Sequence, residues 1–193
     1  SETTVAMNLF PAYQTGENLV FQLDNARFEL ADGGGGDNNN VSAIDTSKWF
    51  HQTQIPNGFS WYNDELQHYT DRIENSYVSE GTLKIVAIKE SFTDRGVTKQ
   101  YTSARLNSKY AFTYGRVEVR AKLPSGNGTW PAIWTLGQNI SELGAYWQIQ
   151  GLGNTPWPNC GEIDIMEHWG NNQNNVKSAM HTPSSHGGTV NKG

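Results

Sequence analysis

The chain has 193 residues and a formal net charge of −5, with 11% aromatic residues, 17% charged residues and twenty glycines. This length suits one sizeable domain, and a composition rich in Trp, Tyr and Gly favours a turn-rich β protein over a long helical bundle. The acidic charge and the absence of a Lys/Arg-rich run argue against nucleic acid or an anionic membrane as partner, so we expect a neutral or weakly charged partner.

The first predicted elements lie in the N-terminal 40 residues. Residues 18–30, "NLVFQLDNARFEL", alternate in a way that indicates one or two strands. Residues 31–40, "ADGGGGDNNN", have the composition of a flexible linker. Because about thirty residues cannot bury a core alone, we interpret residues 1–30 as the tail of a preceding β module or as an N-terminal extension. Residues 41–193 then form the main domain.

Two later segments show the alternation of half-buried strands. In residues 115–123, "GRVEVRAKL", one face is apolar and the other is charged, the apolar face consisting of Val117, Val119, Ala121 and Leu123. Residues 81–90, "GTLKIVAIKE", have a similar pattern. Turn-rich clusters separate these segments and no stretch has a sustained helical period, so the sequence predicts an antiparallel sandwich of packed sheets.

Residues 161–170, "GEIDIMEHWG", place three carboxylates among apolar residues. In a strand, Glu162 and Asp164 share one face, and Ile163 and Ile165 point toward the core on the other. Glu167 is out of phase and would bury an unpaired carboxylate in the core, which is costly. A one-residue β-bulge near Met166 would return Glu167 to the face of the other two carboxylates, so we predict a bulge there.

Three crowded carboxylates suit a reaction that needs both an acid and a base. Mutual repulsion makes one carboxyl retain its proton near neutral pH while another stays ionised, which is what glycoside hydrolysis with retention requires. A solvated negative stripe on a surface strand is an alternative. A calcium or magnesium site is another, although its ligands usually come from a loop with Asn and Gly at short intervals.

The segment "GEIDIME" resembles the active-site strand of glycoside hydrolase family 16, and its bulged spacing is similar to that of the laminarinase, agarase and carrageenase branches. Four other segments resemble laminarinase motifs in the same order, and with the active-site region they span residues 44–185: "WYNDELQHYT", "YTSARLNS", "YGRVEVRAKLPSGNGTWPAIWTLG" and "SAMHTPSS". The resemblance implies an all-β fold, a β-jelly roll sandwich of two curved antiparallel sheets with a concave sugar-binding groove. It also implies a retaining endo-hydrolase of β-1,3-glucan.

The resemblance implies a role for individual residues. Glu162 matches the nucleophile, Glu167 the acid/base, and Asp164 the carboxylate between them that tunes protonation. Groove positions that contact sugars are matched by Asn63, Arg105, Trp130, Trp134 and His181. Trp157 is a further candidate sugar platform, because it lies between prolines on the loop before the catalytic strand. Each of these aromatic and polar residues is also compatible with a purely structural role.

Further expectations concern the surroundings of this domain. The family domain usually continues past the point where this sequence ends, so either a second chain or segment supplies the remaining strands or the given sequence ends early. The family's opening strand is not evident before residue 43, and "LVFQLDNARFEL" could substitute for it, form the last strand of the domain or end a sugar-binding module. No cofactor is expected for catalysis, and the resemblance implies a structural calcium ion on the convex face. The substrate size predicts a secreted or cell-surface protein, and the lone Cys160 cannot form an internal disulfide. The alternatives to a β-1,3-glucanase are a non-catalytic β-glucan-binding protein of the same fold and a hydrolase of agarose or carrageenan.

Overall fold

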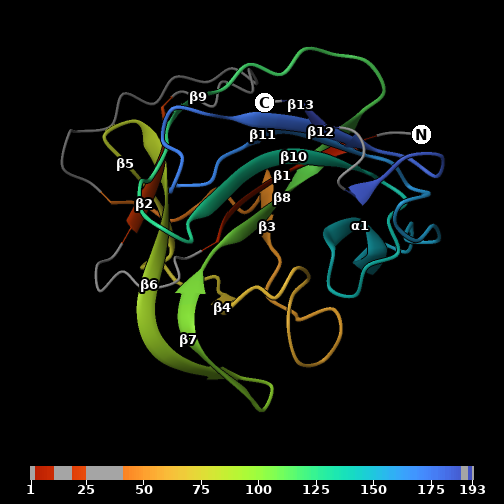
Figure 1. The fold of residues 1–193 in the computed structure, drawn as a ribbon. Helices are drawn as coiled ribbons and strands as arrows, with labels where there is room; N and C mark the ends of the chain where they lie inside the picture. The colour runs from red at the N-terminus through yellow and green to blue at the C-terminus, as the bar shows by residue number, and fades with distance from the viewer. Residues whose placement is uncertain (1–2, 11–18, 25–40, 188–190, 193) are drawn as a thin grey trace.

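The structure is a computed structural model that describes residues 3–10, 19–24, 41–187 and 191–192. Its regular secondary structure is almost entirely β-strand, and strands β6 and β7 are strongly curved (Figure 1). The one helix of the described residues, α1 (Tyr146–Ile149), is a single turn, which agrees with the lack of helical periodicity in the sequence. No helix in this part of the chain is long and apolar enough to cross a membrane.

The strands form two sheets. The larger sheet has seven strands in the order β13 (Asn191–Lys192), β12 (Lys177–His181), β11 (Glu162–Glu167), β10 (Trp130–Gly137), β1 (Thr3–Phe10), β8 (Arg105–Phe112) and β3 (Trp49–His51). The smaller sheet has the order β4 (Gln67–Tyr69), β7 (Val97–Ser103), β6 (Thr82–Asp94), β2 (Leu19–Asp24) and β9 (Arg120–Lys122), and β5 (Ser76–Ser79) pairs with β6. The pairs are antiparallel, as the predicted sandwich requires, with one exception. Strand β4 pairs with β7 in parallel.

The N-terminal strands belong to these two sheets. Strand β1 lies between β8 and β10, and β2 lies between β6 and β9. This pairing differs from the interpretation of residues 1–30 as the tail of a separate module or as an extension. The alternation of apolar and polar side chains in residues 18–30 indicates a strand. It does not indicate with which other strands this strand pairs. The proposed linker, residues 31–40, lies outside the described residues.

The two predicted strands of the middle region are both present, with different lengths. Residues 82–90 of the segment 81–90 lie within β6, as predicted. Within residues 115–123 only Arg120–Lys122 form a strand, β9, and Ala121 is exposed instead of buried. Val119 and Leu123 still pack against the core, so the predicted phase is right at these two positions. Strand β9 pairs with β2 over three residues only.

The core covers both faces of β10. On one face Ile133 joins a cluster with Ile85 of β6 and Leu106 of β8, which packs the two sheets together. On the other face Trp134 and its alternate neighbours join a second cluster that includes Ile55, Trp61, Tyr69, Ala132, Leu136 and Ile140. The strand that supports the active-site strand β11 is therefore buried along most of its length.

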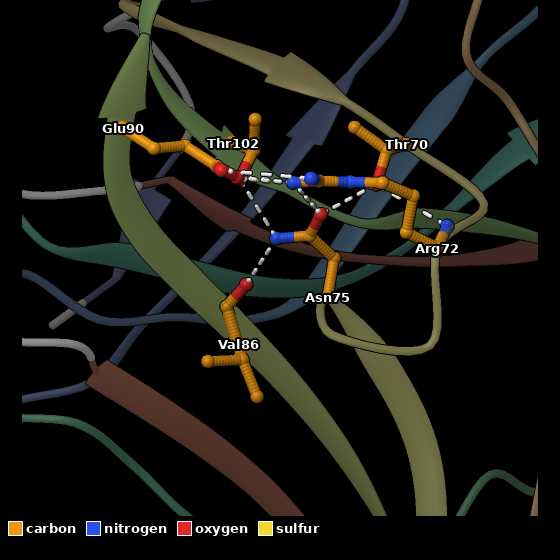
Figure 2. A network of polar contacts seen from close by, with 6 residues as sticks. All are labelled: Thr70, Arg72, Asn75, Val86, Glu90 and Thr102. Carbon is orange, nitrogen blue, oxygen red and sulfur yellow. Dashed lines mark hydrogen bonds and ion pairs between the residues drawn. The ribbon is translucent and has the colours of Figure 1, made fainter. Parts of the chain in front are cut away.

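A polar network holds the turn between β4 and β5 against the smaller sheet (Figure 2). The side-chain amide of Asn75 donates to the Val86 carbonyl and to Thr102 Oγ1, both at 3.0 Å, and Asn75 Oδ1 accepts from Thr70 at 2.5 Å. Arg72 pairs with Glu90, which also accepts a hydrogen bond from Thr102. Asn75 is fully buried, so this network satisfies polar groups that would otherwise be costly to bury.

Candidate active site

The bulge predicted in β11 is present. Trp134 pairs with Asp164 and Ile133 pairs with Met166, so Ile165 is the extra residue on β11. The pairing with β12 also shifts, between Asp164 and Glu167. Two consecutive residues of β11 thus occupy one step of the ladder, and Glu167 returns to the face of the other carboxylates.

The apolar face of β11 is only partly buried. Ile165 and Met166 pack against the core cluster between the sheets. Ile163, which the strand phase placed in the core, is 45% exposed, so that prediction is wrong. Its cross-strand neighbour Met180 is 49% exposed as well. The alternation gives the direction of the side chain correctly, but the described core extends only as far as Ile165.

The three carboxylates open into one cavity of about 440 Å³ on the face of β10 opposite the sheet-to-sheet core. Its wall is formed by alternate residues of β10, by the loop that contains Asn63, and by the segments around residues 141 and 157. The lining residues are Tyr62, Asn63, Glu65, Arg105, Trp130, Ala132, Trp134, Leu136, Ile140, Ser141, Glu142, Pro156, Trp157, Glu162, Asp164 and Glu167. The cavity therefore gathers residues from segments that are about 100 positions apart.

Glu162 and Asp164 form a coupled pair at one end of this row. Burial raises the pKa of both carboxyls, and the charge of Asp164 raises the pKa of Glu162 further. A side-chain hydrogen bond joins the two, so the pair shares a proton at neutral pH. The Trp157 indole donates from Nε1 to Glu162 Oε2 at 3.1 Å, which stabilises the ionised form of Glu162.

His181 is bonded on both ring nitrogens. The Gly187 backbone N–H donates to Nδ1 at 3.0 Å, so Nδ1 carries a lone pair. The proton of the neutral ring is then on Nε2, which lies 3.0 Å from Asp164 Oδ2 and donates to it. Nε2 lies 3.7 Å from Glu162 Oε1, too far for a hydrogen bond. His181 therefore orients Asp164 directly and Glu162 only through Asp164.

Glu167 has a different environment at the other end of the row. Burial and the negative charge of Asp164 raise its pKa to about 7. The Trp130 indole donates from Nε1 to Glu167 Oε1 at 2.9 Å, and Lys177 lies opposite Glu167 on β12; both lower this pKa and partly offset the burial. Each outer carboxylate thus accepts an indole N–H, and a carboxyl with a pKa near 7 is suited to general acid catalysis at neutral pH.

Arg105 lies in a second charged group deeper in the cavity. Its guanidinium is 4.8 Å from the Trp134 ring and 5.2 Å from the Trp61 ring, and its Nη2 donates to Glu142 Oε1 at 2.8 Å. Gln52 also donates to Glu142, at 2.5 Å. Arg105 is only 3% exposed, so the cation is held in place by stacking and an ion pair.

Glu65 is a buried carboxyl that the sequence analysis did not select. It accepts hydrogen bonds from Gln67 Nε2 at 2.7 Å and from the Tyr69 hydroxyl at 3.0 Å. Burial raises its pKa to about 7, although Arg105 opposes this shift. Glu65 lies within the motif "WYNDELQHYT", which the resemblance singled out, whereas Glu142 lies in a loop whose sequence carries no comparable signal.

The structure brings all the selected residues to this region, with different contacts. Asn63 lines the cavity in the left-handed conformation, with φ of 56°. Trp157 is 44% exposed on its loop, whereas Trp134 is 9% exposed and has Arg105 beside its ring. Trp130 stacks on Trp169, a residue that the sequence analysis did not select. Sugar contacts by these residues stay predictions.

Among the described residues, one group could hold a metal ion: Glu162, Asp164 and His181, whose ligand atoms lie within 4.8 Å of one another. This group does not fit calcium, because calcium takes oxygen ligands and one of the three donors is an imidazole nitrogen. The Gly187 N–H at Nδ1 also leaves the proton on Nε2, the nitrogen that faces the two carboxylates. The structural calcium ion of the convex face stays a prediction.

The buried carboxyls make the stability of the fold depend on pH. The pKa of Glu65 rises from 4.5 to about 7 on folding, so the folded state holds this proton more tightly, and the free energy of unfolding falls as pH rises through that interval. We expect Glu65→Gln to raise the melting temperature at pH 8 relative to the unmodified protein, with little difference at pH 4. Glu74→Gln, on the exposed surface, is the control. An equal change at both pH values would contradict the assignment.

Comparison with known proteins identifies the family. Glycosyl hydrolases family 16 matches residues 63–192. A beta-glucanase from Rhodothermus marinus is 46% identical over 141 residues, which cover 72% of this chain and 43% of that protein.

Two solved structures are similar as well. A LamA variant from Z. galactanivorans in complex with laminaritriose and laminaritetraose is 58% identical, with a TM-score of 0.71, over 76% of this chain and 59% of that chain. The laminarinase catalytic domain from Thermotoga maritima is 42% identical, with a TM-score of 0.64, over 78% and 57%. The chain thus spans less than two thirds of the length of these relatives. The family match, the shared fold and the three carboxylates on the bulged strand show that the chain belongs to glycosyl hydrolases family 16.

Proposed function

We propose that the protein is a retaining endo-hydrolase of β-1,3-glucan. The observation that carries this proposal is the row of Glu162, Asp164 and Glu167 in one cavity, where burial and the neighbouring charge of Asp164 raise the pKa of Glu162 and of Glu167. The similar proteins, a beta-glucanase, a LamA variant in complex with laminaritriose and laminaritetraose, and a laminarinase catalytic domain, support the same substrate class. Intact carboxylates favour this reading over a glucan-binding protein that does not cleave.

In the proposed double displacement each carboxylate takes the role that the family resemblance implies for it. Glu162 attacks the anomeric carbon, and Glu167 donates its proton to the leaving glycosidic oxygen; the bond from carbon to that oxygen breaks as the glycosyl ester forms. Asp164 accepts the proton that Glu162 shares with it, which frees the Glu162 carboxylate for attack. Glu167, now ionised, then takes a proton from water, and the water oxygen displaces Glu162 from the anomeric carbon.

The charge of the cavity favours a neutral polysaccharide. Among the described residues, five carboxyl side chains line it, and the one lining Lys or Arg residue, Arg105, is already paired with Glu142. Although several of these carboxyls have raised pKa values, the described lining offers no unpaired Lys or Arg to bind a sulfate group, so carrageenan is disfavoured. Neutral glucan and agarose remain compatible with this charge. Because such polymers do not cross membranes, we also propose that the protein acts outside the cell or at its surface.

The proposal is tested by digesting laminarin, mixed-linkage β-glucan, agarose and carrageenan side by side. Release of reducing ends is measured for each, together with proton NMR of the first products from laminarin. We expect internal cleavage of laminarin with the β-configuration retained, and no cleavage of carrageenan. Binding of laminarin without any released sugar would support the glucan-binding alternative, and inverted product would exclude the covalent route.

The two indole donors predict opposite changes in the pH profile of kcat/KM. Trp130→Phe removes the donor to Glu167 and raises the pKa of the acid, so the basic limb should move up by about one pH unit. Trp157→Phe removes the donor to Glu162 and raises the pKa of the nucleophile, so the acidic limb should move up instead. Each variant is the control for the other. Movement of the same limb in both would show that the two roles are not separated as proposed.

A further inference from the structure

Trp169 is linked to the catalytic row through another indole. Its ring stacks on that of Trp130, with centroids 5.3 Å apart and planes inclined by 21°. Trp130 in turn donates its N–H to Glu167. Trp169 does not itself line the cavity that holds the three carboxylates. Trp169 can therefore influence the reaction through the orientation of Trp130.

The backbone next to Trp169 is attached to the segment that precedes Trp130. Gly170 N donates to the Thr129 carbonyl at 3.0 Å, and Gly126 N donates to the Gly170 carbonyl at 3.1 Å. A Cβ at Gly170 would lie 1.9 Å from Thr129 Oγ1, so this close approach requires glycine. The end of β11 and the start of β10 are thus held together, and the two indoles are brought face to face.

Lys177 completes this arrangement from the neighbouring strand. Its ammonium nitrogen lies 4.9 Å from the centroid of the Trp169 ring, within the range of a cation–π contact. Lys177 is also the cross-strand partner of Glu167, so both side chains emerge on the same face of the sheet. A cation, two stacked rings and the acid/base carboxylate therefore form one continuous series of contacts.

We infer that Trp169 is a positioning residue for the acid/base Glu167, acting through the indole of Trp130. The inference rests on the proposed function, in which Glu167 protonates the leaving oxygen. A general acid must present its proton to one atom of the substrate. The Trp130 N–H occupies Oε1 and leaves Oε2 to carry that proton, and the Trp169 ring prevents the Trp130 ring from turning away.

The kinetic test compares two substrates that differ in their need for an acid. Laminarin oligosaccharides have an alcohol leaving group and require protonation, whereas a dinitrophenyl β-laminaribioside has a leaving group that departs without it. For Trp169→Ala we expect kcat/KM to fall about tenfold or more on the oligosaccharides and less than about twofold on the aryl glycoside, because acid assistance alone is impaired. Trp169→Phe keeps an aromatic ring stacked against the Trp130 indole, so its kcat/KM on the oligosaccharides should be close to that of the unmodified protein.

A spectroscopic test does not depend on turnover. The Trp130 indole N–H resonance, assigned by its absence in Trp130→Phe, is followed by NMR through a pH titration and reports the ionisation of Glu167. In Trp169→Ala the midpoint should move to higher pH, because a weaker hydrogen bond stabilises the carboxylate less. Trp169→Phe should titrate close to the unmodified protein.

The outcomes separate the inference from the function. Equal losses of kcat/KM on both substrates, or an unchanged titration midpoint in a folded Trp169→Ala, would overturn the role of Trp169. A protein that cleaves neither substrate, yet shows the expected shift of the titration midpoint, would overturn the proposed function while supporting the link from Trp169 to Glu167. If Trp169→Ala does not fold, the same two measurements on Trp169→Leu, which keeps apolar volume without an aromatic face, decide the matter.

Discussion

Glu162→Ser is expected to abolish turnover of laminarin while leaving glucan binding largely intact. The hydroxyl is a much weaker nucleophile than the carboxylate, and it leaves the anomeric carbon without a partner for the covalent intermediate. Burial, together with the charge of Asp164, raises the pKa of Glu162, so removing this carboxyl removes the cost of ionising it inside the cavity. We therefore expect the variant to melt at a higher temperature than the unmodified protein at neutral pH.

The measurements are reducing-end release, calorimetric binding of laminarin oligosaccharides and thermal unfolding. Glu118→Ser, which replaces an exposed carboxylate that does not line the cavity, is the matched control and should behave like the unmodified protein. Near-normal turnover by Glu162→Ser would remove Glu162 from its assigned role. Loss of binding together with turnover would show that the substitution disturbs the cavity rather than the chemistry.

Insertion of one alanine after Met166 is expected to have the largest effect on both folding and activity. The present bulge has one extra residue, Ile165, and this extra residue aligns Glu167 with Asp164. A second extra residue reverses the phase again and turns Glu167 toward the apolar core, where an unpaired carboxylate costs about 3–5 kcal/mol. Hydrolysis should become undetectable, and the midpoint of denaturant unfolding should fall.

Deletion of Met166 is the companion experiment. The spacing then becomes E-x-D-x-E, in which strict alternation places all three carboxylates on one face without a bulge. We expect a folded protein with reduced but detectable hydrolysis, since the packing of Met166 against the core is lost. Full activity of the insertion variant, with Glu167 still required, would show that strand phase does not place this carboxylate.

The sequence by itself determined the local features of the active-site strand. Side-chain alternation has a period of two, so the spacing of Glu162, Asp164 and Glu167 alone predicts a shared face and a bulge, and the structure has both. The same rule places the apolar positions of residues 81–90 in a strand. These predictions succeed because they depend on backbone geometry within a few residues, which no distant contact alters.

Tertiary structure alone decided what surrounds each carboxylate. The donors to Glu162 and Glu167 are two indoles from separate segments, and the proton position on His181 depends on the backbone N–H of Gly187. Ile163 is exposed although side-chain alternation places it on the apolar face of β11. Strand pairing and loop packing bring these groups together over long sequence separations.

The same reason explains the residues that sequence reasoning did not select. Glu142 pairs with Arg105 across 37 positions in the sequence. Trp169, which follows the end of β11, stacks on Trp130 at the start of β10. Strand β1 lies between β8 and β10, which its own sequence does not predict. A pKa, a tautomer or an ion pair is set by distances of a few ångströms in space, and those distances are fixed only when the sheets pack.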